Sequence, residues 1–302
     1  MAKALERPAE SGVLRRHRGL TFQSGAYQYS ITRQGEQSIY SVTDGKQTIA
    51  VPILYVFGQG KAGQTYVLRH GGELYESRVS FYERVGGLDL TLGAPSAAPT
   101  SLEAALGRRM NQDDVRDCFG CHATAAVNGP KAQLDKLVPG VRCEACHGPG
   151  ARHVAAVKAG NLKQKQIFNP AALGGDELNQ EFCGACHRSA SDVVTMPAAG
   201  GTGSVRFQPY RMFTSRCYSD DRRISCTACH DPHADPEQAP EFYDAKCLAC
   251  HQADGKGGAA RAPHPKQTRG CVSCHMPKVE LPGSHFKFTD HQIRVVKPGA
   301  AP

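Results

Sequence analysis

The sequence predicts an α+β fold in which an antiparallel β module precedes a mostly helical and irregular second half. Alternating apolar and polar residues with short turn signals occupy residues 21–95 of the 302-residue chain, which is typical of paired strands. All 13 cysteines lie after that module, among many of the 32 glycines and 19 prolines. The second half should therefore consist of short helices between loops, with little regular secondary structure.

The β module is expected to contain four or five strands joined by tight turns. Asp44-Gly45 and Gly71-Gly72 are two-residue hairpin signals between alternating runs. Pro52 interrupts the most apolar run, so that strand should bulge or lie at an edge. The predicted strands are 25–33, 37–43, 47–57, 64–70 and 73–82.

Two short helices are expected outside the strands. One lies within residues 1–20, before a basic turn that contains His17. The other opens at the capping box Thr100-Ser-Leu-Glu103 and continues to about Met110. The predicted divisions are an N-terminal segment at 1–20, the β module at 21–95, a linker and helix at 96–117, and a cysteine-rich domain at 118–302.

The segment Gly58-Gln-Gly60-Lys-Ala-Gly63 matches the glycine pattern of dinucleotide-binding proteins. That pattern requires a helix directly after the glycines. Here a strand-like run follows, so we expect a turn or bulge and no dinucleotide site.

The motif Cys-x-x-Cys-His occurs six times and uses twelve of the 13 cysteines. The first cysteines are Cys118, Cys143, Cys183, Cys226, Cys247 and Cys271, the second are Cys121, Cys146, Cys186, Cys229, Cys250 and Cys274, and the histidines are His122, His147, His187, His230, His251 and His275. The remaining Cys217 is expected to be a buried thiol, or to bridge to a cysteine outside this sequence.

The spacing of the motif indicates c-type haem. Two thiols three positions apart share one face of a helical turn, where they can form thioethers with the two vinyl groups of one porphyrin. The histidine that follows then binds the iron. Zinc sites also use Cys-x-x-Cys pairs, but they do not need a histidine after every pair. Six haems within residues 118–275 would lie in near contact and would themselves form the core of this domain.

Seven histidines outside the motifs could bind the opposite faces of the six irons, which would give bis-histidine coordination. His153 and His233 follow their motifs too closely to reach the far side of the iron that the same motif binds. Each of them should therefore bind the iron of a neighbouring haem. The distal candidates are His153, His233, His285, His291, His264 and His17. His70, at the end of a predicted strand, is the expected spare.

Composition narrows the class of protein further. The formal charge of +8 would be more than offset by the propionates of six haems, so nucleic acid is not an expected partner. No run of about 18 apolar residues predicts a membrane span. Haem is attached to such motifs after export, so we expect a periplasmic or extracellular protein whose signal sequence is missing from the given chain.

The second half resembles the multihaem cytochrome c superfamily, in particular the group that includes the tetrahaem cytochrome partner of hydroxylamine oxidoreductase. The resemblance covers about residues 113–292 and includes His147-Gly-Pro-Gly-Ala-Arg-His153, His230-Asp-Pro-His233 and Cys274-His275-Met-Pro-Lys278. It implies that His153 and His233 are distal ligands. Similar sequences often carry a further haem motif upstream, and no family role is known for residues 21–95.

These features favour an electron carrier that passes electrons through six covalently bound haems to a redox partner. One alternative is an oxidoreductase acting on a small nitrogen or sulfur compound at one open haem iron. Related enzymes often mark that haem with lysine in place of the motif histidine, whereas all six motifs here end in histidine. A second alternative is a self-associating, haem-bearing filament subunit.

Overall fold

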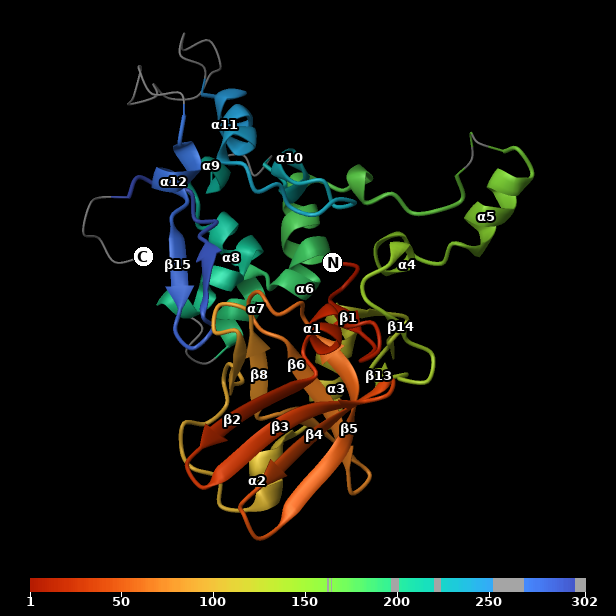
Figure 1. Ribbon diagram of the computed structural model, residues 1–302. Helices are drawn as coiled ribbons and strands as arrows, with labels where there is room; N and C mark the ends of the chain where they lie inside the picture. The colour runs from red at the N-terminus through yellow and green to blue at the C-terminus, as the bar shows by residue number, and fades with distance from the viewer. Residues whose placement is uncertain (162, 164, 197–200, 220–223, 252–268, 297–302) are drawn as a thin grey trace. The chain divides into compact units, whose positions relative to one another are not determined.

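The computed structural model describes residues 1–161, 163, 165–196, 201–219, 224–251 and 269–296, and these form an α+β protein (Figure 1). The chain divides into two compact units. The first contains Met1–Phe168 with Pro282–Phe286, and the second contains Asn169–Leu281 with Lys287–Pro302. The first unit therefore holds the β module together with the first two cysteine motifs, and the other four motifs belong to the second unit.

An eight-stranded antiparallel sheet organises the first unit. Its order is β10-β7-β6-β5-β4-β3-β2, with β1 paired to β5; Figure 1 shows β2 to β5 side by side in red and orange. The strands are β1 Leu5–Glu6, β2 Gly19–Ser24, β3 Tyr27–Gln34, β4 Gln37–Thr43, β5 Thr48–Phe57, β6 Thr65–His70, β7 Glu73–Ser77 and β10 Gly107–Arg109, and β8 Val79–Tyr82 pairs separately with β9 Gly87–Leu90.

The five predicted strands are present, and both predicted hairpins join them. Gly45 has φ +86°, and Gly71 and Gly72 have φ +57° and +86°, a region that favours glycine. The predicted strand 73–82 is divided at Arg78 into β7 and β8. The predicted bulge in β5 is present as a register shift between Ile53 and Tyr55, although this strand lies inside the sheet.

The glycine-rich segment forms a turn and no nucleotide-binding helix. Gly60 N donates to Gly63 O at 3.2 Å, and strand β6 follows directly. The interpretation of this segment as a turn between strands is therefore confirmed.

The predicted helix at residues 100–110 is shorter than expected. Ser101 caps α2, Leu102–Leu106, by accepting a hydrogen bond from Ala104 N at 3.1 Å. The helix ends there because Gly107–Arg109 pairs with β7 as strand β10. At the N-terminus, the expected helix is α1, Gly12–Arg16, with Ser11 as its N-cap and His17 at its C-terminus.

Apolar packing differs between the units. A large core in the first unit includes Tyr29, Tyr40 and Leu68, each 0 % exposed. Among the described residues of the second unit, the apolar cluster contains only Val193 and Phe207 as buried members. The elements outside the main sheet and the motifs are short: β11 Ala123–Thr124, β12 Val127–Asn128, β13 Lys131–Ala132, β14 Val138–Pro139, α5 Ala151–Lys158, η1 Pro170–Ala172, α7 Ala190–Thr195, η3 Gly201–Arg206, α8 Gln208–Phe213, α9 Arg216–Ser219, β15 Lys278–Leu281 and β16 Phe286–Thr289.

Gly107→Ala tests the close approach that ends α2. A Cβ at Gly107 would lie 2.0 Å from Glu76 O, whereas a Cβ at Gly19 would meet no atom within 4 Å. We expect Gly107→Ala to lower the free energy of unfolding by more than about 1 kcal/mol, and Gly19→Ala to change it by less than about 0.5 kcal/mol. Urea denaturation followed by circular dichroism measures both, and equal effects would contradict this account of the strand.

Candidate haem-binding site

Each of the six cysteine motifs lies on or at the end of a short helical segment. In the fourth and fifth motifs the histidine N–H closes a helical turn on the first cysteine: His230 N to Cys226 O is 2.9 Å and His251 N to Cys247 O is 3.0 Å. Such a turn places the two thiols on one side of the helix. The segments are α3 Gln112–His122, α4 Cys143–His147, η2 Glu177–Cys183 followed by α6 Gly184–His187, α10 Cys226–Cys229, α11 Pro240–Leu248 and α12 Cys271–His275.

The first motif is held against the sheet by Phe119, which is 0 % exposed and lies between its two cysteines. Its ring makes edge contacts with Tyr55 and Phe57, with centroid distances of 5.0 and 5.1 Å. Burial raises the pKa of the Cys118 thiol to about 11 and lowers the pKa of His122. This histidine is therefore neutral at pH 7, as a metal-binding imidazole must be.

Three motif histidines make the same hydrogen bond through Nδ1. His122 Nδ1 lies 3.1 Å from Ala4 O, His147 Nδ1 lies 2.9 Å from Phe168 O, and His275 Nδ1 lies 2.8 Å from Arg294 O. A carbonyl oxygen can only accept, so Nδ1 carries the proton and the lone pair resides on Nε2. Histidines that bind metals usually donate their other ring N–H in this way.

The described residues of the motifs thus fit a c-type haem. Their thiols are unbridged, paired at the spacing that two vinyl groups require, and followed by a histidine whose lone pair lies on Nε2 at His122, His147 and His275. The donor set is sulfur for the porphyrin edge and nitrogen for the metal.

His291 faces one of these motif histidines in the second unit. The ring centroids of His230 and His291 lie 6.2 Å apart, close to the roughly 6 Å expected of two imidazoles that bind one metal at about 2 Å each. His291 Nδ1 donates to Thr289 O at 3.0 Å, which again leaves Nε2 with its lone pair. Burial lowers the pKa of His291 to about 4.

A buried ion-pair cluster holds the segment that carries His291. Asp290 is 0 % exposed; it accepts hydrogen bonds from Arg211 Nε at 2.7 Å and from Arg294 Nη1 at 2.5 Å. Burial alone would raise the pKa of Asp290, but these arginines hold it below its ordinary value. Ser215 Oγ donates to His291 O at 2.8 Å. Sequence reasoning missed this cluster because Arg211 and Asp290 lie 79 residues apart along the chain.

His153 has the same Nδ1 hydrogen bond to a backbone carbonyl as the three motif histidines, whereas the Nδ1 of His233 lies near a carboxylate. His153 Nδ1 lies 2.5 Å from Lys165 O, which leaves Nε2 with the lone pair. The His233 side chain is 74 % exposed, and its Nδ1 lies 3.5 Å from Asp231 Oδ1. Both assignments as distal ligands remain predictions.

The other distal candidates lie in different surroundings. His285 uses Nε2, the nitrogen that the motif histidines leave open, in a 2.8 Å hydrogen bond to Asp89 Oδ2, and its ring contacts Tyr82 at 4.8 Å. His17 packs against Phe81 with a centroid distance of 5.0 Å. His264 lies outside the described residues. Among the described residues, the contacts of His285 and His17 given above are with Asp89, Tyr82 and Phe81, and none of these is a motif histidine.

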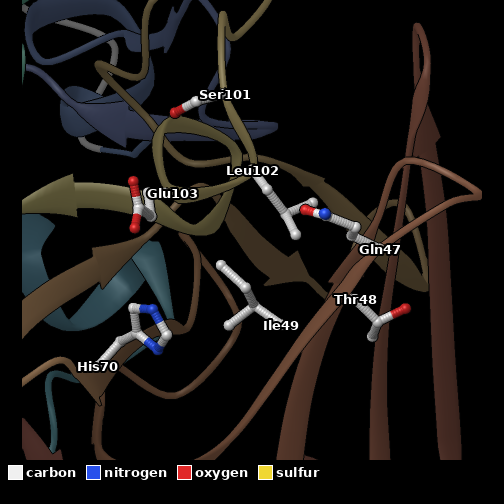
Figure 2. Close-up of a pocket in the computed structure, with 7 residues that line it drawn as sticks. All are labelled: Gln47, Thr48, Ile49, His70, Ser101, Leu102 and Glu103. Atoms are coloured by element: carbon white, nitrogen blue, oxygen red, sulfur yellow. The ribbon is translucent and has the colours of Figure 1, made fainter.

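His70 lines a shallow pocket of the first unit. The lining residues are Gln47, Thr48, Ile49, His70, Ser101, Leu102 and Glu103. Figure 2 shows these side chains around the opening, and they include no cysteine. The assignment of His70 as the spare histidine remains a prediction.

Cys217, the cysteine outside the motifs, lies in α9 as a half-buried thiol. Burial raises its pKa, so the group stays protonated at neutral pH. Both alternatives for Cys217, a buried thiol and a bridge to a cysteine outside this sequence, remain predictions.

Comparison with known proteins agrees with this reading of the motifs. Residues 95–148, which contain the first two motifs, match the family model for cytochrome c554 and c-prime. The chain is also 24 % identical over 211 residues to the multiheme cytochrome MtrA of Shewanella baltica (strain OS185). These similarities support a multihaem cytochrome c family for the chain.

The match to that relative covers 68 % of the chain and 53 % of the relative, so the chain spans about half of the relative's length. No solved structure matches the chain significantly. Within the described residues, no helix combines the length and apolar character needed to cross a membrane.

Arg211→Ala tests the buried cluster that supports His291. It would leave the Asp290 carboxylate buried with Arg294 as its remaining basic partner, so we expect a loss of about 3–5 kcal/mol in the free energy of unfolding. Arg116→Ala is the control: its partners Asp113 and Asp117 have side chains 76 % and 50 % exposed, and the expected loss is below about 1 kcal/mol. Urea denaturation of the two variants decides, and similar small losses would contradict a structural role for Asp290.

Proposed function

We propose that this multihaem cytochrome carries electrons through six covalently bound c-type haems. The observation that carries the proposal is the repeated motif whose histidine donates from Nδ1 to a backbone carbonyl, seen at His122, His147 and His275. That arrangement prepares Nε2 for iron at the position that follows each thiol pair. The same roles are proposed for His187, His230 and His251 from the identity of their motifs.

When bound, haem supplies a one-electron iron couple. The residues of the chain determine the position and orientation of each haem. The thiols anchor the porphyrin edge, the histidines set the orientation of the axial imidazole, and the surrounding peptide limits access of water.

We propose that His291 is the distal partner of His230 and that His153 is a distal ligand of another motif. Two imidazoles on one iron leave no open position for a substrate, which favours electron transfer over catalysis at that iron. His233, His285, His264 and His17 remain predicted distal ligands.

The proposed location is an exported compartment, periplasmic or extracellular, because c-type haem is attached there. Redox proteins are the proposed donor and acceptor. Similarity to a multiheme cytochrome is consistent with both statements. Self-association is compatible with the sequence, since further ligands or docking surfaces could come from a second copy.

The haem count is tested by intact mass. Expressed with a signal sequence in a host that attaches c-type haem, the protein should gain the mass of six haems. Cys271→Ser with Cys274→Ser should reduce the gain to five haems, and Cys217→Ser should leave it at six. A colourless product, or bound zinc in place of haem, would overturn the proposal.

His291→Ala tests the proposed axial pair. We expect one haem to change from low spin to high spin, because the iron beside His230 would lose its distal imidazole. His70→Ala, in the pocket of the first unit, should leave the ferric optical and paramagnetic resonance spectra unchanged. Identical spectra for His291→Ala and wild type would refute the assignment of His291.

A further inference from the structure

One arrangement occurs twice in the second unit: a buried polar side chain just before one motif caps the first turn of the next motif. Asn179 precedes Cys183 by four residues, and its Oδ1 accepts from Cys226 N at 2.8 Å. Asp244 precedes Cys247 by three residues, and its oxygens accept from Gly270 N at 2.6 Å and Cys271 N at 2.8 Å. Asn179 is 0 % exposed and Asp244 is 4 % exposed.

Each capping side chain also lies where two attachment cysteines meet. The Cys226 thiol contacts Asn179 Oδ1 at 3.0 Å, and the neighbouring Cys183 thiol raises the pKa of Cys226. At the second position, burial and the neighbouring Asp244 carboxylate raise the pKa of the Cys271 thiol, and the Cys247 thiol acts on it in the opposite direction. Asn179 and Asp244 are thus equivalent positions, each beside the sulfurs of two consecutive motifs.

The two positions differ in charge. Asn179 is neutral, and its amide also donates to Ile224 O at 2.7 Å. Asp244 is acidic, its partners are neutral backbone N–H groups, and in the described part of the chain no lysine or arginine forms an ion pair with it. The Asp244 carboxylate is therefore a poorly screened negative charge, since burial weakens screening by solvent and salt.

We propose that Asp244 lowers the reduction potentials at the Cys247 and Cys271 motifs, and that Asn179 leaves the Cys183 and Cys226 motifs without this contribution. A nearby negative charge stabilises the oxidised iron, which is more positive by one charge than the reduced iron. The inference rests on the proposed haem attachment and adds a residue that influences the reduction potentials of the attached haems. The contribution favours electron flow from the Cys247 and Cys271 pair toward the Cys183 and Cys226 pair.

The test is a reciprocal substitution in the full, haem-loaded chain, read as midpoint potentials by spectroelectrochemistry. Asp244→Asn should raise the midpoints of two haems, and Asn179→Asp should lower the midpoints of two others. We expect each change to alter the ratio of oxidised to reduced haem at fixed potential about tenfold, which is 59 mV for a one-electron couple. Glu241→Gln, an exposed position on the same helix α11, removes the same charge and should leave the curve nearly unchanged.

Further variants separate charge from structure. Asp244→Glu keeps the carboxylate, so its midpoints should stay close to wild type even if packing suffers. If Asp244→Asn carries all six haems but its midpoint potentials equal those of the wild type, the inference is overturned while the proposed function stands. The same holds if Glu241→Gln shifts the midpoint potentials as much as Asp244→Asn does. If Asp244→Asn fails to mature, Asn179→Asp decides, and the absence of a downward shift in it overturns the inference. A wild-type protein without haem would instead overturn the proposed function.

Discussion

The hydrogen bond from a histidine Nδ1 to a backbone carbonyl is the interaction on which the candidate haem sites depend. It determines which ring nitrogen carries the proton, and therefore which nitrogen can bind iron. The acceptor for His122 is Ala4 O, 118 positions earlier in the chain, and the acceptor for His275 is Arg294 O, 19 positions later. The orientation of the axial imidazole is thus a property of the folded chain, although the motif itself is local.

The two units are stabilised in different ways, and the difference follows the distribution of motifs. The first unit has a conventional apolar core behind its sheet, and Phe119 joins the first motif to that sheet. The second unit holds four motifs, and the apolar cluster in its described part has only Val193 and Phe207 as buried members. Its buried residues include polar side chains beside the apolar ones, among them Asp290, Arg211, Asn179 and Asp244. A unit of this kind needs another source of apolar burial, and porphyrins attached at its four motifs would supply it.

The sequence predicts the features that are local and misses those that depend on distant contacts. Alternation and turn glycines predict the strands from β3 to β6, because both signals lie within a few residues of each strand. Gly107 was expected inside a helix, since only its pairing across the sheet to Ser77 shows that it starts a strand. The equivalence of Asn179 and Asp244 is hidden because they precede their motifs by four and three residues and act on motifs further along the chain. Likewise, His285 and His291 are only six residues apart, yet one bonds Asp89 and the other faces His230.

Each Cys-x-x-Cys-His motif is local in sequence, whereas the carbonyl groups that orient three of the motif histidines lie far away along the chain. This difference suggests that haem attachment and folding occur in a definite order. Two thiols and a histidine within five residues can be recognised in an unfolded chain, before any of the long-range carbonyl acceptors is in place. In the folded chain, burial raises the pKa of Cys118 and Cys247, to about 11 and about 12, so these thiols are protonated and weakly reactive. Because recognition of the motif needs only five neighbouring residues, thioether formation can precede folding, and the hydrogen bonds to Nδ1 can form afterwards. In that order, the chain first acquires the apolar group that its second unit lacks and then folds around it.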